Sequence, residues 1–260
     1  MKTVIFCGGK GTRLQEETEY KPKALVMVGS KPILWHIMKL YSHYGYNDFI
    51  LCLGYKGNMI KDYFLNYDEL NHDFTLSLGS GVKQIVHHKK ETPNWNITFA
   101  DTGLERGTAH RLLSIRPYVK DDEHFFLTYG DGVANVNISS LLEHHKSMGK
   151  VMTVTAVKPP NPFGVIEIEE HSVKTFAEKP QSRDWTNGGF FVCSNKVFNY
   201  LTEDESSMLE FDTLRKLSHS GELAVYRHDD FWHCVDTLKH LEGLNALYHR
   251  GSRPWMIWEA

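Results

Sequence analysis

Several features that mark whole classes of protein are scarce in this sequence of 260 residues. No apolar run is long enough to span a bilayer, and the first one, Lys2–Cys7, is too short for a secretory signal peptide. Positive charge is not in excess, because 29 Lys and Arg stand against 32 Asp and Glu, so no global field favours nucleic acid or anionic lipid. We therefore expect a cytoplasmic protein without a nucleic-acid or membrane partner.

Cysteine is also rare, and histidine, although common, shows no metal-binding spacing. The four cysteines, Cys7, Cys52, Cys193 and Cys234, are far apart and lie mostly in apolar runs, which predicts reduced core thiols rather than disulfides or a zinc site. The adjacent pairs His87-His88 and His144-His145 do not share a helix face, and no HxxxH spacing occurs. We interpret both pairs as solvated surface residues.

The first half of the chain alternates β-type and helical patterns. We predict strands at 2–7, 48–53, 96–100, 124–129 and 151–157, and helices at 31–44, 58–67, 108–115 and 138–147. This alternation is typical of an α/β fold: a Rossmann-like, doubly wound, mostly parallel sheet with helices on both faces. Ligands of such sheets bind at the carboxyl ends of the strands.

From about residue 160 the pattern changes to shorter β-type runs, at 165–168, 173–176, 190–192 and 223–226. We interpret them as an antiparallel β addition in the C-terminal half, folding over the active face. No linker-like stretch interrupts the chain, so we expect a single domain over 1–260, with a nucleotide-binding half at 1–157 and an acceptor-binding and metal-completing half at 158–260. Residues 68–95 look like an insertion, whose packing partner the sequence leaves open.

A glycine-rich segment, Gly8-Gly9-Lys10-Gly11-Thr12-Arg13-Leu14, follows the first predicted strand directly. Glycines allow backbone N–H groups to approach phosphate oxygens closely. The segment matches neither GxGxxG, since Leu14 replaces the last glycine, nor the Walker A pattern. Two cations stiffened by a proline, Lys21-Pro22-Lys23, come shortly afterwards.

Together these two segments resemble the signature of the sugar-phosphate nucleotidyltransferases. In that family the loop and its arginine hold the triphosphate, and the second lysine contacts the phosphates at the reacting centre. The resemblance thus implies nucleotide binding by Gly8, Gly9, Gly11, Thr12 and Arg13. It implies that Arg13 and Lys23 are the catalytic residues.

An exposed carboxylate is expected in Tyr129-Gly130-Asp131-Gly132, at the end of a predicted strand, although Asp-Gly is also a common turn. A triphosphate bound there needs a divalent cation, and Mg²⁺ takes one or two carboxylates plus phosphate oxygens. Asp236, again between an apolar run and a helix, offers the second carboxylate, and a helix N-cap is its alternative role. We predict Mg²⁺ on Asp131 and Asp236, with Gly130 at the nucleotide.

Further segments complete the resemblance and narrow it to a branch. Glu178-Lys179-Pro180 resembles the motif that faces the sugar phosphate, and Asn187-Gly188 resembles the stretch that follows it in the cytidylyl branch. The segments at 31–39, 54–57, 101–103 and 128–134 are similar to those of the glucose-1-phosphate cytidylyltransferases of bacterial surface-polysaccharide pathways. By motif, that branch implies CTP contacts at Thr102 and Arg111, and acceptor contacts at Glu178, Lys179, Asn187 and Gly188.

The resemblance implies that a phosphate oxygen of glucose 1-phosphate attacks the α-phosphorus of CTP and gives CDP-glucose and pyrophosphate. Segments 104–110 and 206–212 depart from the family pattern, so another phosphorylated acceptor remains open, as does a catalytically inactive, nucleotide-sensing relative. A nicotinamide-dependent oxidoreductase is disfavoured, because the third glycine of its loop is missing. We expect a homo-oligomer, whose size the sequence leaves open.

Overall fold

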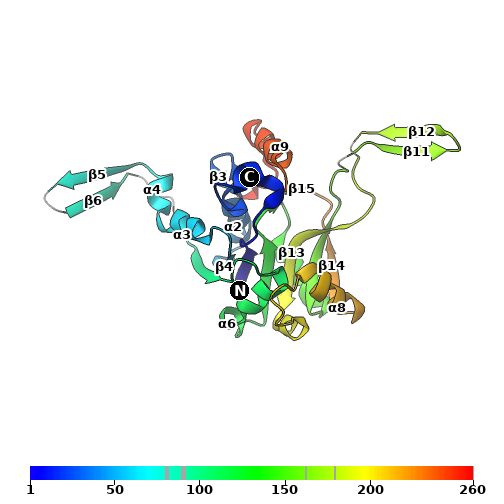
Figure 1. The fold of residues 1–260 in the computed structure, drawn as a ribbon, viewed down its shortest axis with the longest axis horizontal. Helices are drawn as coiled ribbons and strands as arrows, with labels where there is room; N and C mark the ends of the chain where they lie inside the picture. The colour runs from blue at the N-terminus through cyan, green and yellow to red at the C-terminus, as the bar shows by residue number, and fades with distance from the viewer. Residues whose placement is uncertain (80–81, 89–91, 162, 179, 260) are drawn as a thin grey trace.

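A seven-stranded sheet forms the centre of the described chain (Figure 1). The computed structural model describes residues 1–259 except 80–81, 89–91, 162 and 179. The strand order is β14-β10-β13-β8-β1-β4-β7. These strands are β1 (Lys2–Phe6), β4 (Asp48–Leu53), β7 (Asn96–Asp101), β8 (His124–Tyr129), β10 (Met152–Val157), β13 (Thr186–Ser194) and β14 (Leu223–Arg227).

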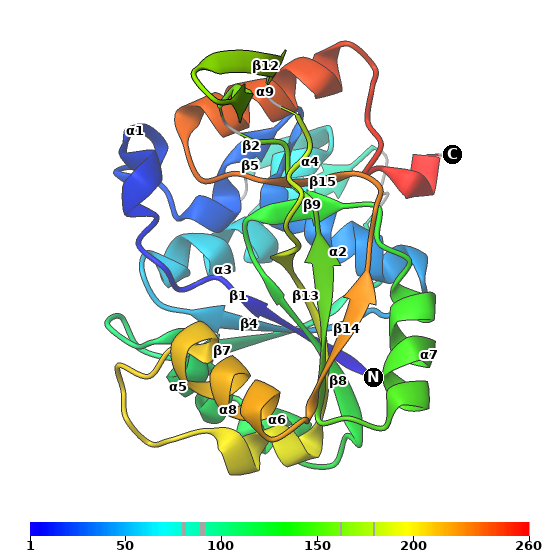
Figure 2. The same cartoon turned by 90° about the vertical axis from the view of Figure 1, so that its right-hand side faces the viewer.

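Helices cover both faces of this sheet, as Figure 2 shows. They are α1 (Gln15–Thr18), α2 (Ile33–His43), α3 (Gly57–Leu65), α4 (Tyr67–Asn71), α5 (Thr108–Ser114), α6 (Arg116–Val119), α7 (Ile138–Met148), α8 (Leu214–His219) and α9 (Leu238–His249). Short 3₁₀ turns lie at Thr12–Leu14, Lys23–Leu25, Asn195–Tyr200 and Ile257–Glu259, and a π-helical turn at Leu209–Thr213.

Alternating side chains of the strands divide the core into two layers. In β1, Ile5 packs with the cluster that contains residues of α2, α7 and α9. Its neighbours Val4 and Phe6 point to the other face and pack with residues of α5 and α8. Because both faces of the central strands β1, β4 and β8 are buried, these strands are mostly apolar, as is typical of a parallel sheet between helices.

The predicted mostly parallel sheet is confirmed, since β1 pairs in parallel with β4 and β8, and β4 with β7. The interpretation of the C-terminal β-type runs needs correction. β13 and β14 are not part of a separate addition: β13 lies between β8 and β10, antiparallel to both, and β14 pairs in parallel with β10. A period-two pattern shows that a segment is extended, but not which strand it pairs with.

The antiparallel addition itself is the hairpin of β11 (Val165–Glu169) and β12 (Ser172–Ala177). A second hairpin, β5 (Phe74–Gly79) with β6 (Val82–His87), lies within the inserted segment 68–95. Figure 1 shows both hairpins extending away from the central sheet, on opposite sides of the molecule. The β5–β6 hairpin of the insertion therefore extends away from the body of its own chain.

Two smaller pairs complete the fold: β2 (Met27–Val28) with β3 (Lys31–Pro32), and β9 (Gly132–Ala134) with β15 (Trp232–Cys234). All four cysteines are free, and Cys234 is the least buried of them. The surface prediction for the His144-His145 pair is wrong for His145, which is buried against the sheet. In the described part of the chain, no helix combines the length and the apolar character needed to cross a bilayer.

Candidate active site

The glycine loop lies where β1 ends, at the carboxyl edge of the parallel strands. A side chain at Gly8 would overlap the guanidinium group of Arg111, so only glycine fits there. Gly11 has φ of +65°, the left-handed region that glycine adopts without strain, and it starts the 3₁₀ turn Thr12–Leu14. A side chain at Gly9 would meet no atom within 4 Å. The loop is thus held at Gly8 by contact with Arg111 and is open at Gly9.

Arg111 on α5 holds this loop from inside the protein. The residue is only 3% exposed. It donates hydrogen bonds to the carbonyl oxygens of Gly8, Leu53, Gly103 and Leu104 at 2.8–3.2 Å and to Oγ1 of Thr102 at 2.8 Å. The predicted CTP residues Thr102 and Arg111 therefore tie the ends of β4 and β7 to the glycine loop. Their direct contact with CTP stays a prediction.

Two cations and two carboxylates form an ion cluster in front of the loop. Nζ of Lys23 lies 2.6 Å from Oδ2 of Asp131 and 2.7 Å from Oδ1 of Asp236. Arg13 Nη1 lies 3.0 Å from the other oxygen of Asp236. The side chains of Lys23, Asp131 and Asp236 are 15–27% exposed, whereas that of Arg13 is 74% exposed. The structure brings together the four charged residues that the sequence had singled out.

Burial and ion pairing act in opposite directions on these groups. Burial disfavours the charged form of Lys23, but the charge of Asp131 and the hydrogen bonds to both carboxylates outweigh it and raise the pKa of the lysine. Burial alone would raise the pKa of Asp236, and pairing with Lys23 and Arg13 lowers it instead. Lys23 and Asp236 are therefore both charged at neutral pH.

The short β9–β15 pair brings the two carboxylates to one place. Gly132 lies opposite Cys234, and the N–H of Val235 donates to the carbonyl oxygen of Asp131. Asp131 and Asp236 therefore flank the same end of the pair. The alternative role of Asp236 as a helix cap is wrong, because Thr237 caps α9 by accepting a hydrogen bond from the N–H of His240.

These carboxylates, together with Cys234, are a possible metal site: one ligand atom from each residue lies within 4.8 Å of the others. Burial and the two neighbouring carboxylates raise the pKa of the Cys234 thiol well above its ordinary value, which keeps it protonated. A protonated thiol is a poor ligand, whereas two carboxylates suit a hard divalent cation. The sequence pattern predicted Cys234 as a structural core thiol, not as a neighbour of the carboxylates.

Two cavities meet at the ion cluster. One, of about 310 Å³, is lined by the glycine loop, Lys23 and Arg111. The other, of about 380 Å³, is lined by Asn187, Gly188 and Asp236. Both cavities include Arg13, Tyr129 and Asp131 in their walls. A ligand in one cavity would thus meet a ligand in the other beside these charged groups.

Of the predicted acceptor residues, two lie at the second cavity. The backbone of Asn187 and Gly188 is held there, because Trp232 Nε1 donates to the carbonyl oxygen of Gly188 at 2.7 Å and Asn187 Oδ1 accepts from the N–H of Gly189. Glu178 follows β12 at the base of the projecting hairpin and does not line this cavity. Lys179 lies outside the described residues.

The two segments that depart from the family pattern form one wall of the site. The N–H groups of Gly107 and Ala109 donate to the carbonyl oxygens of Glu205 and Ser207. Oε2 of Glu210 accepts from Thr108 at 2.9 Å, and its other oxygen accepts from the Tyr129 hydroxyl. The contacts of Tyr129 and Thr108 with Glu210 were not predicted, because no local pattern indicates a contact between residues about eighty to a hundred positions apart.

The fold and this site define an α/β transferase that handles phosphates, with a glycine loop, two cations and two carboxylates at the carboxyl edge of a parallel sheet. The chain belongs to the nucleotidyl transferase family, whose sequence model matches residues 2–251. It is therefore a nucleotidyltransferase, and members of this family generally use a divalent metal ion.

Curated relatives match the chain over its whole length. A Bacillus subtilis protein named probable glucose-1-phosphate cytidylyltransferase is 47% identical, covering 99% of this chain and all of the relative. The glucose-1-phosphate cytidylyltransferases of Salmonella typhi and Salmonella typhimurium are each 46% identical, with full coverage of both chains.

Solved structures share the fold at low sequence identity. A putative glucose-1-phosphate thymidylyltransferase from Bacillus anthracis has a TM-score of 0.70 at 19% identity, covering 97% of this chain and 95% of that one. HddC from Yersinia pseudotuberculosis has a TM-score of 0.69 at 20% identity, covering 95% and 99%. These two similarities support the Rossmann-like architecture.

Proposed function

We propose that this enzyme transfers the cytidylyl group of CTP to glucose 1-phosphate and produces CDP-glucose and pyrophosphate. The observation that carries this proposal is the 46–47% identity, over essentially the whole chain, to relatives named for that activity. The two cavities that meet at Arg13 and Asp131 are consistent with a donor and an acceptor reacting there.

In this reaction a phosphate oxygen of the acceptor forms a bond to the α-phosphorus of CTP, and the bond from that phosphorus to the bridging oxygen of pyrophosphate breaks. The acceptor is already an anion at neutral pH, so no protein nucleophile is needed. The cysteines nearest the site support this mechanism, since burial raises the pKa of the Cys7 and Cys234 thiols and keeps them protonated. The chain's contribution is then positioning and charge stabilisation.

We assign the charge stabilisation to Arg13 and Lys23. Arg13 is exposed and paired only at its tip in the described structure, so it can turn toward the leaving phosphates. Lys23 lines the first cavity and contacts Asp131, which lines both, so it can neutralise charge that develops on the α-phosphate. The open face of the glycine loop offers backbone N–H groups to the triphosphate, and Arg111 holds the loop in that orientation.

We propose Mg²⁺ as the divalent ion, held by Asp131 and Asp236. The two carboxylates fit this ion, because they supply hard oxygen ligands within 4.8 Å of each other and lie beside both cavities. When bound, the ion would neutralise phosphate charge and favour in-line attack. In the described structure Lys23 compensates the same two carboxylates.

Acceptor binding is proposed for Asn187, Gly188, Glu178 and Lys179. Asn187 and Gly188 line the second cavity together with Glu210, whose carboxylate can accept a hydrogen bond from a sugar hydroxyl. A site that hydrogen-bonds hydroxyl groups rejects acceptors that lack them by several orders of magnitude. Glucose 1-phosphate should therefore be clearly preferred over its deoxy analogues.

The deciding experiment is a pyrophosphate-release screen of the four NTPs and dTTP against a panel of sugar 1-phosphates, with Mg²⁺. CTP with glucose 1-phosphate should give the highest kcat/KM, with kcat of about 1–10³ s⁻¹. Equal turnover with dTTP would contradict the cytidylyl assignment. Trace turnover of glucose 1-phosphate while CTP binds tightly would point to another acceptor, and no turnover with any pair would favour a nucleotide-sensing relative.

We further propose that the enzyme is a homo-oligomer and acts as one nucleotidyltransferase domain in the cytoplasm, where CTP and sugar phosphates are available. The two projecting hairpins support the first point, because they expose apolar side chains such as Leu78 (80%) and Ile168 (70%). Light scattering should detect an oligomer for the wild type. The double variant Leu78→Lys with Ile168→Lys should form this oligomer more weakly. Leu65→Lys, at an exposed leucine on α3, is the control. A monomeric wild type would contradict this proposal.

A further inference from the structure

A second large cavity lies at the edge of the central sheet opposite to the glycine loop. Its volume is about 990 Å³, enough for a small organic ligand. It adjoins the start of β8, whose other end leads to Asp131, and the end of β13, which runs antiparallel to β8. The cavity therefore shares no residue with the two cavities of the active site.

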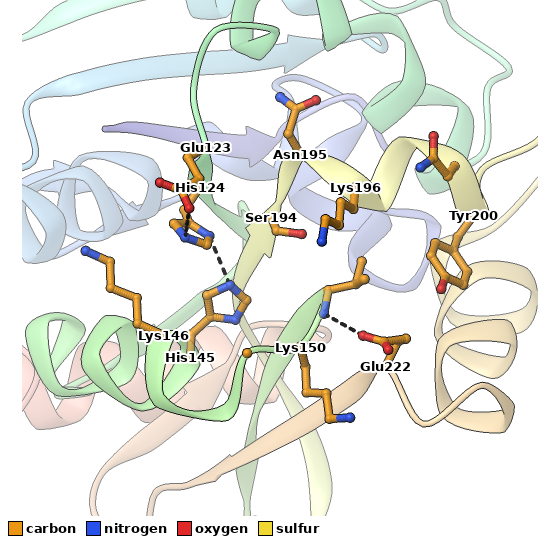
Figure 3. A pocket seen from close by; sticks show the side chains of 13 residues that line it. Glu123, His124, His145, Lys146, Lys150, Ser194, Asn195, Lys196, Tyr200 and Glu222 are labelled. Carbon is orange, nitrogen blue, oxygen red and sulfur yellow. Dashed lines mark hydrogen bonds and ion pairs between the residues drawn. The ribbon is translucent and has the colours of Figure 1, made fainter.

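Three lysines from separate segments surround this cavity (Figure 3). Lys146 belongs to the last turn of α7, Lys150 to the loop before β10, and Lys196 to the 3₁₀ turn after β13. In Figure 3, Lys196 lies between Ser194 and Tyr200. None of the three lysines forms an ion pair with a described residue, since the salt bridges of the described chain do not include them.

The carboxylates of the cavity wall have other partners. Oε2 of Glu222 accepts a hydrogen bond from the N–H of Val151 at 3.2 Å, and Glu123 lies 3.5 Å from Nε2 of His124 with most of its side chain in solvent. By contrast, Lys21 elsewhere on the surface pairs with Glu17 at 2.8 Å. The wall thus holds three lysines against two carboxylates, and none of these lysines is ion-paired with a described residue.

One imidazole at the cavity is oriented from inside the protein. Nδ1 of the buried His145 lies 2.8 Å from Oγ1 of Thr153, and its Nε2 lies 3.2 Å from Nδ1 of His124. Both nitrogens of His145 and the inner nitrogen of His124 are therefore used. Nε2 of His124 faces the exposed carboxylate of Glu123, so the two imidazole rings form a fixed part of the cavity wall.

We infer that this cavity binds a small organic phosphate, whose phosphoryl oxygens contact Lys146, Lys150 and Lys196. A phosphoryl group offers several acceptor oxygens and negative charge, which match unpaired ammonium groups. The volume exceeds that needed by inorganic phosphate, and the side chain of Tyr200 gives the organic part of the ligand an aromatic surface. This site does not depend on the identity of the donor or the acceptor in the reaction.

Inorganic pyrophosphate, titrated calorimetrically into the full chain in the presence of EDTA, tests the inference. Wild type should bind it at two sites, one of which Lys23→Ala removes. Lys146→Ala with Lys196→Ala should weaken the other site by at least about tenfold, because two charge-assisted contacts are lost. Lys61→Ala with Lys174→Ala, which changes the net charge equally outside both regions, should leave both sites intact.

A second measurement does not require the lysine variants to fold. In wild type and in Lys23→Ala, pyrophosphate should shift the imidazole NMR signals of His124 and His145. A single binding site that Lys23→Ala abolishes, with unshifted histidine signals, would overturn the inference. The inference would also be overturned if Lys146→Ala with Lys196→Ala and Lys61→Ala with Lys174→Ala weakened pyrophosphate binding equally. Binding would then depend only on the overall charge of the chain.

Discussion

Replacing Lys23 with alanine should slow turnover and, at the same time, strengthen Mg²⁺ binding to the nucleotide-free protein. Nζ of Lys23 lies 2.6 Å from Asp131 and 2.7 Å from Asp236, so the ammonium group occupies the position between the carboxylates that a metal ion would use. The substitution removes a catalytic charge and also a competitor of the metal. These two effects have opposite signs in two different assays.

The structure sets the size of both effects. With ligand atoms of the two carboxylates within 4.8 Å, their mutual repulsion is about 3 kcal/mol at an effective dielectric constant of about 20. Solvent screens part of it, because both side chains are about a quarter exposed. We therefore expect Mg²⁺ affinity to rise about tenfold, which is about 1.4 kcal/mol. Loss of one positioned cation should lower kcat by about 10²–10³.

Calorimetric titration of Mg²⁺ without nucleotide measures the first effect, and pyrophosphate release at saturating CTP measures the second. Lys21→Ala is the matched control, because Lys21 belongs to the same short motif but pairs with Glu17 at 2.8 Å. It should leave both quantities unchanged. If Lys23→Ala bound Mg²⁺ no more tightly than wild type, Lys23 would not compete for the carboxylates. Wild-type turnover would make it a surface lysine.

Three further predictions concern the metal, the loop and the buried histidines. Asp131→Asn and Asp236→Asn should each raise the Mg²⁺ concentration needed for half-maximal activity without lowering the melting temperature, and a double variant no worse than either single one would indicate a shared ion. Arg111→Met should lower the free energy of unfolding by about 3 kcal/mol or more in denaturant titrations, because buried acceptors lose their donors. An unchanged midpoint of the unfolding transition would contradict the structural role of Arg111. Burial lowers the pKa of His36 and of His145 from 6.5 to about 4, so the unfolded chain binds more protons between these values. Each histidine contributes at most about 3 kcal/mol to the free energy of unfolding. This contribution is present above pH 6.5 and is lost as the pH falls to 4. His145→Asn should make the free energy of unfolding depend less on pH when it is measured at several pH values.

The sequence by itself determined the features that depend on neighbouring residues. Period-two and helical patterns located the strands at 48–53 and 124–129 with the bounds that the structure has, because burial on two faces of a sheet imposes an apolar run. The glycine loop was equally readable, since its positive φ and its close approach to Arg111 require glycine. Family resemblance then pointed to Arg13 and Lys23, and the need of a triphosphate for a divalent cation pointed to Asp131 and Asp236.

Only the tertiary structure decided which distant residues meet. Lys23 contacts carboxylates 108 and 213 positions away, and a short strand pair, not a motif, brings these carboxylates together. The tertiary structure likewise decided that β13 joins the central sheet antiparallel to its neighbours, and that Arg111 acts in the interior. Such contacts depend on how segments far apart in the chain pack, whereas sequence patterns report only the local environment of each segment. The buried His145 and the lysine-lined cavity beside it follow from that packing alone.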